Sequence, residues 1–82
     1  MTIAELNAAA YARAARNLID DLVELRLNQM LTQAEVARAM GTSAPAVNHY
    51  EHHRREPGLR WLMRYADAVG AEITFVMRRS GQ

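Results

Sequence analysis

The chain has 82 residues, of which half are hydrophobic and 23% are charged, and its formal net charge is +1. This length and balance fit one small, soluble globular domain with a modest core. The absence of cysteine excludes a disulfide scaffold, a cysteine-ligated zinc finger and thiol catalysis. No apolar run could cross a bilayer, and no secretory signal opens the sequence. We therefore expect a cytoplasmic protein that does not bind a membrane.

The charges are distributed unevenly along the chain. Residues 1–37 hold three arginines against five acidic residues, whereas residues 38–64 hold five arginines against two acidic residues. The second segment also contains all three histidines. A locally basic segment is weak support for a polyanionic partner.

The N-terminal part predicts helix. Thr2 and Glu5 have the spacing of a capping box, and they precede an alanine-rich run that favours helix. Residues 1–16 are interpreted as a helical arm, which is either separate or the first turns of one long helix. From Leu18 to Leu27 apolar residues recur near helical spacing, so an amphipathic helix should end around residues 28–30.

Two short helices follow. Thr32 and Glu35 form a second capping pattern, and Gly41 stands where a left-handed helix end is needed. Ser43 can cap the next helix, in whose first turn Pro45 is tolerated. The intervening link has the length expected of a helix-turn-helix. The first short helix should bury Val36, Ala37 and Met40, with the small Ala37 where the two helices touch.

The second short helix should present one polar face to solvent. Val47 and Tyr50 are expected to face the core. The outward positions are then Ala44, Pro45, Asn48, His49 and His52. An amide and two histidines suit the edges of bases and phosphates in a DNA groove. We expect these histidines to meet phosphates, and no metal, because no aspartate or cysteine completes a ligand set nearby.

The C-terminal part predicts one more helix and a strand. Pro57 and Gly58 form a break, and Gly70 ends a helix. That helix carries an apolar stripe, with two aromatic residues at its core or core edge; the residues are Leu59, Leu62, Met63, Ala66, Val69, Trp61 and Tyr65. Residues 71–78 alternate as a strand does, and no other segment could pair with them. We therefore expect the strand to pair, across a dimer, with the same strand of a second copy, so that residues 71–82 form a dimerisation strand and tail with Ile73, Phe75 and Met77 in the interface.

Two stretches resemble a known family. T-Q-A-E-V-A-R-A-M-G-T-S-x-x-x-V-N-x-Y-E and P-G-L-R-W-L-M-R-Y-A-D-A-V-G-A are similar to the lambda-repressor-like (Cro/CI, XRE) helix-turn-helix family, over about residues 17–70. The resemblance implies a mainly α bundle of four to five helices that binds DNA. It also implies an internal ion pair between Arg26 and Glu51. It further implies that Gln33 bonds a DNA phosphate and braces the start of the recognition helix.

The sequence departs from the family pattern at two places. Met30 replaces the usual glycine before Leu31, and Ala44, followed by Pro45, stands at the start of the recognition helix where glutamine or serine is usual. Base readout should then depend on Asn48, His49 and apolar contact with thymine methyl groups. The full set of expected DNA contacts is Thr32, Gln33, Ser43, Ala44, Pro45, Asn48, His49, His52, Arg54 and Arg55.

Three functions compete, and none is catalytic. The sequence has no glycine-rich phosphate loop and no G-x-S-x-G motif, so we expect neither an enzyme nor a cofactor. The first interpretation is a homodimeric repressor on a palindromic operator, acting as the autoregulatory antitoxin of a toxin. The second is a Cro-like or immunity regulator of a phage or prophage. The third is a protein-interaction module that does not bind DNA.

Overall fold

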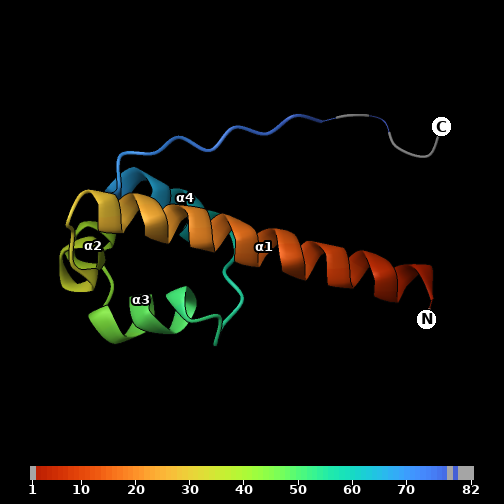
Figure 1. The fold of residues 1–82 in the computed structure, drawn as a ribbon, viewed down its shortest axis with the longest axis horizontal. Coiled ribbons are helices and arrows are strands. Elements are labelled where there is room, and N and C mark those ends of the chain that lie inside the picture. The colour runs from red at the N-terminus through yellow and green to blue at the C-terminus, as the bar shows by residue number, and fades with distance from the viewer. Residues whose placement is uncertain (1, 78, 80–82) are drawn as a thin grey trace.

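The computed structural model describes residues 2–77 and residue 79, and it is a bundle of four helices. These are α1 (Ile3–Asn28), α2 (Gln33–Met40), α3 (Ala44–Glu51) and α4 (Leu59–Ala68). Figure 1 shows α1 lying across the other helices and extending well beyond them toward the N-terminus. Helix α2 packs against α3 and α4, and α1 packs against the same two helices. The expectation of a mainly α bundle is confirmed.

The alanine-rich arm is the first part of a single 26-residue helix, not a separate element. The hydroxyl oxygen of Thr2 caps α1 by accepting a hydrogen bond from the backbone N–H of Glu5 at 3.1 Å. A helix of this length spans about 39 Å. Residues 3–11 are all exposed, and the first buried side chain is that of Ile19. The N-terminal half of α1 therefore adds nothing to the core.

Local chemistry sets the limits of α2 and α3. Both bonds of the capping box are present at α2, because Thr32 N–H donates to Glu35 Oε1 at 2.8 Å and Glu35 N–H donates to Thr32 Oγ1 at 3.0 Å. Ser43 Oγ caps α3 by accepting from the N–H of Ala46 at 3.2 Å. Gly41 ends α2 in the left-handed conformation, at a φ of 72°. The two helices and their turn therefore form where the sequence predicts.

The core lies between the inner faces of the four helices. Its buried apolar residues are Ile19, Leu22, Val36, Ala37, Met40, Val47, Leu62, Tyr65, Ala66 and Val69. Every inward position predicted for α2 is buried, and so is Val47. Tyr50 is only half-buried and stacks on Trp61, with ring centroids 4.2 Å apart.

The expected stripe of α4 is partly wrong. Leu59 and Met63 are 55% and 44% exposed, whereas Tyr65 is completely buried. The buried face of α4 follows residues 62, 65, 66 and 69, which is the i, i+3, i+4, i+7 spacing of a single helix face. Because the other helices cover only this face of α4, Leu59 and Met63 lie beside it and stay largely exposed.

The strand predicted at the C-terminus is wrong for the residues that the structure describes. Residues 71–77 form neither helix nor strand, and residue 78 lies outside the described residues. A strand is stable only when it pairs with another strand, and the described part of the chain contains no strand. Ile73 instead packs against the helical core, while Phe75 and Met77 are 60% and 94% exposed. In the view of Figure 1, this segment extends without regular structure in the same direction as the projecting N-terminal end of α1.

All four helices are followed by a left-handed residue. These are Met30, Gly41, His53 and Gly70, with φ between 58° and 73°. After α1, the Leu31 N–H donates to the Arg26 carbonyl at 3.1 Å and the Met30 N–H donates to the Leu27 carbonyl at 3.0 Å, which is a Schellman end. Met30 thus holds a glycine-type conformation at the position where the resembled family has glycine. A side chain there is disfavoured by roughly 1 kcal/mol.

Replacing Met30 with glycine should stabilise the protein. The Met30 side chain is 88% exposed, so Met30→Gly removes the left-handed strain and loses almost no packing. We expect the free energy of unfolding in urea to rise by about 0.5–1 kcal/mol. Gly41→Ala is the matched control and should lower it by about 1 kcal/mol. A Met30→Gly variant no more stable than the parent would contradict this explanation of the first loop.

Candidate nucleic-acid interface

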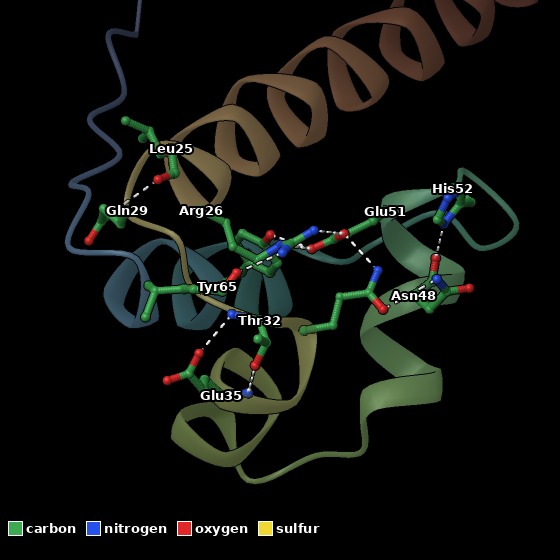
Figure 2. Close-up of polar contacts among 11 residues, drawn as sticks. Leu25, Arg26, Gln29, Thr32, Glu35, Asn48, Glu51, His52 and Tyr65 are labelled. Atoms are coloured by element: carbon green, nitrogen blue, oxygen red, sulfur yellow. Dashed lines mark hydrogen bonds and ion pairs between the residues drawn. The ribbon is translucent and has the colours of Figure 1, made fainter.

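A buried carboxylate lies at the end of α3, where all four helices meet. Glu51 is 8% exposed, and its two oxygens accept four hydrogen bonds. Arg26 of α1 donates through Nε at 2.8 Å and Nη2 at 2.9 Å. Gln33 of α2 donates through Nε2 at 3.0 Å, and Tyr65 of α4 donates through its hydroxyl at 2.5 Å. Figure 2 shows Arg26, Tyr65 and Glu51 converging on this point.

The protonation states in this network are strongly fixed. Burial alone would raise the pKa of Glu51, but the hydrogen bonds from Arg26, Tyr65 and Gln33 outweigh it and hold that pKa below its ordinary value. Burial opposes the charge of Arg26 as well, yet the bond to Glu51 raises the pKa of its guanidinium. Burial and the bond to Glu51 both raise the pKa of Tyr65. At neutral pH the carboxylate is therefore ionised and the phenol protonated.

Further polar contacts attach α1 to the rest of the bundle. The Nη1 group of Arg26 donates to the carbonyl of Leu31 at 2.7 Å, which fixes the loop between α1 and α2. Gln29 donates through Nε2 to the carbonyl of Val69 at 2.6 Å and so joins the ends of α1 and α4. Arg64 of α4 donates to the carbonyl of Met40 at the end of α2. Hydrogen bonds from α1 and α4 thus fix both ends of α2.

The outward face of α3 is narrower than expected. Pro45, His49 and His52 are exposed, but Ala44 and Asn48 are half-buried. Asn48 turns toward α2 and donates through Nδ2 to Gln33 Oε1 at 3.3 Å. The ring of His52 donates through Nδ1 to the backbone carbonyl of Asn48 at 2.9 Å, which leaves Nε2 as its outer nitrogen. The expected base-contacting residues therefore include exposed side chains and one side chain, that of Asn48, which is hydrogen-bonded to α2.

The remaining expected contacts surround α3. Thr32 and Ser43 are exposed, and the hydroxyl of each already accepts a capping bond. Arg54 and Arg55 are exposed in the loop after α3. The guanidinium carbon of Arg55 lies 5.9 Å from the ring centroid of Tyr50, which is within cation–π range. Ser43 thus stands at the beginning of α3 and the two arginines follow its end, whereas Thr32 caps α2.

The third histidine faces α1 instead of joining the other two. His53 Nε2 lies 2.9 Å from Asp20 Oδ1, so the carboxylate of α1 accepts from the ring. Among the residues that the structure describes, no group of three histidines, cysteines or acidic residues could hold a metal ion.

Sequence reasoning missed two residues of this site. Tyr65 was predicted as a core aromatic, and nothing in its spacing indicated that its hydroxyl reaches Glu51. Gln29 and Val69 are 40 positions apart, so no pattern of neighbouring residues in the sequence indicates their contact. Both contacts depend on how α4 packs against the other helices.

Two short helices at a tight turn, with the second presenting a partly polar face, define a helix-turn-helix DNA-binding domain. The family model described as Helix-turn-helix matches residues 22–76, and the chain belongs to this XRE-type family. Two curated relatives, each named Antitoxin HigA1, come from two strains of Mycobacterium tuberculosis. Each is 41% identical over 66 residues, which cover 80% of this chain and 44% of the relative.

The chain thus spans less than half the length of these relatives. No solved structure matches it. None of the helices in the described part of the chain is long and apolar enough to span a membrane.

Breaking the buried ion pair should destabilise the fold strongly. Arg26→Met or Glu51→Leu alone leaves a charged partner buried without compensation, which costs about 3–5 kcal/mol. The double variant should lose much less than the sum of the two, as urea melts of all three would show. Asp20→Ala is the matched control, because the pair of Asp20 with His53 is exposed and should contribute less than about 1 kcal/mol. Additive losses in the cycle would contradict a direct coupling.

Proposed function

We propose that this chain is a DNA-binding antitoxin that represses its own operon as a homodimer. The observation that carries this proposal is the 41% identity, over 80% of the chain, to proteins named Antitoxin HigA1. Membership of the helix-turn-helix family supports the DNA-binding half of the proposal. In an antitoxin of this kind, a cognate toxin is the second partner.

The proposed contacts follow from the geometry of α3. The helix enters the major groove, where Asn48 and His49 read base edges and Pro45 offers an apolar surface to thymine methyl groups. Arg54 and Arg55 are exposed next to the end of α3 and supply phosphate contacts that weaken with salt. The caps Thr32 and Ser43, together with Ala44, His52 and Gln33, complete the contact set.

The length of α3 supports two copies on DNA. Eight residues span only about 12 Å, which is roughly a third of a DNA turn, so one copy reads few base pairs. A two-fold dimer would place two such helices about 34–36 Å apart on a palindromic operator. The exposed side chains of Phe75 and Met77 offer apolar surface for this contact. Ile73 already packs on its own core and contributes less.

The antitoxin proposal is tested at the gene's own locus. The chain should bind promoter DNA upstream of its gene, and its co-expression should relieve growth arrest caused by the adjacent gene. Promoter binding without relief, beside integrase or capsid genes, would favour the phage-type regulator. Failure to shift any DNA from the locus would favour a protein-interaction module and overturn the proposal. The Glu5→Gln variant, changed at an exposed position far from α3, is the control for expression.

Base readers and phosphate contacts should respond differently to substitution. Asn48→Ala should weaken operator binding by about 1–3 kcal/mol and leave binding to random DNA nearly unchanged. Arg55→Ala should weaken binding to both DNAs alike and flatten the dependence on salt. Electrophoretic shifts at several salt concentrations would measure both. Equal losses of Asn48→Ala on operator and random DNA would rule out Asn48 as a base reader.

An apolar C-terminal contact predicts an effect on assembly. Phe75→Asp should shift the protein toward monomer and weaken operator binding, because a charge would be placed in the interface. Thr74→Asp is the adjacent control and should leave the assembly unchanged, since Thr74 is exposed and already polar. Sedimentation would measure the mass of each variant. A dimeric Phe75→Asp protein would place the interface elsewhere.

A further inference from the structure

A small cavity lies between α1 and the loop that joins α3 to α4. Its volume is about 90 Å³, well below the roughly 300–1,000 Å³ of pockets for drug-sized ligands, so it takes only a small group. Its apolar lining residues are buried or half-buried, and they are Ala12, Ala15, Ile19 and Pro57. Its polar lining residues are all exposed, and they are Arg16, His53, Arg55 and Glu56. The cavity therefore has an apolar floor and a charged rim.

The two walls of this cavity are joined by a direct contact. His53 Nε2 lies 2.9 Å from Asp20 Oδ1, which ties the loop to α1 across 33 positions of sequence. His53 has a φ of 60°, and the N–H of Arg54 donates to the carbonyl of His49 at 2.9 Å, so the chain turns at His53. The loop that carries Arg55 is thus fixed both to the end of α3 and to α1.

The two arginines of the rim come from opposite walls, Arg16 from α1 and Arg55 from the loop. In the described part of the chain, neither of them forms an ion pair. The guanidinium carbon of Arg55 lies 5.9 Å from the ring centroid of Tyr50, and a guanidinium stacked on an aromatic face keeps its N–H groups free to donate. Glu56 balances one of the two arginine charges, so the rim retains a positive charge.

We propose that this cavity is a phosphate-binding site whose donors are Arg16 and Arg55. A phosphate group has oxygens in several directions, so it accepts hydrogen bonds from guanidinium groups that come from two different elements. The apolar floor lowers the local dielectric constant and strengthens the attraction between the charges. The phosphate belongs either to the backbone of bound DNA or to a small phosphorylated molecule. The DNA source rests on the proposed function, whereas the site itself does not.

The first measurement is the salt dependence of DNA binding by the whole chain, on promoter DNA and on random DNA. Arg16→Gln should reduce the slope of log K against log salt by about 0.9 for each bound chain, because one phosphate contact is lost. Arg13→Gln is the matched control and should leave the slope unchanged. It removes the same charge from an exposed position of α1, but Arg13 does not line the cavity. Glu56→Gln should tighten binding by about twofold, because it removes the opposing charge.

The second measurement uses inorganic phosphate alone, without DNA. The Nε–H resonances of Arg16 and Arg55 are followed by NMR while sodium phosphate replaces sodium chloride at constant ionic strength. Free phosphate at the site should shift both resonances to saturation. Arg16→Gln should abolish the shift of Arg55, and Arg13→Gln should preserve it. Urea melts of the variants verify that each is folded, as expected for substitutions at exposed positions.

The two measurements distinguish the sources of the phosphate and separate the site from the proposed function. A reduced slope in Arg16→Gln identifies a phosphate of the DNA backbone. A saturable phosphate shift with an unchanged slope, or with no DNA binding at all, identifies a small phosphorylated ligand, and the site then stands even where the proposed function fails. Equal effects of Arg16→Gln and Arg13→Gln would show that only the total charge of α1 matters and would overturn the inference. No effect of Arg16→Gln in either measurement would overturn it as well.

Discussion

The carboxylate of Glu51 is the group on which the arrangement of the four helices depends. It lies on α3, and its donors come from α1, α2 and α4, so it is satisfied only when all four helices meet in one geometry. Apolar packing is not directional, whereas these bonds have fixed partners and distances. In a chain with so small a core, this buried carboxylate therefore adds contacts of fixed direction to the packing of the apolar residues.

Features set by local chemistry could be predicted from the sequence. Helix caps and left-handed ends depend on a few neighbouring residues, and Thr32, Ser43 and Gly41 act as their residue types indicate. The pairing of Arg26 with Glu51 is different, because these residues are 25 positions apart and no spacing rule connects them. That pair was implied by the family resemblance, and the structure joins the two side chains.

Features that depend on a partner or on packing angles could not be predicted. Alternation in residues 71–77 describes how a strand would expose its faces, but it does not supply another strand to pair with. Asn48 was predicted as an outward residue, and only the packing of α2 against α3 shows that Gln33 braces it.

Helix α1 has two parts with different roles: an exposed N-terminal part and a C-terminal part that packs on the other helices. The polar network uses only the last turns of α1, through Arg26 and Gln29, and the core begins at Ile19. Residues 3–11 are exposed throughout. Substitutions among residues 3–11 therefore remove no contact of the core or of the polar network. The N-terminal end of the molecule could therefore change in sequence while the core and the polar network around Glu51 stay as they are.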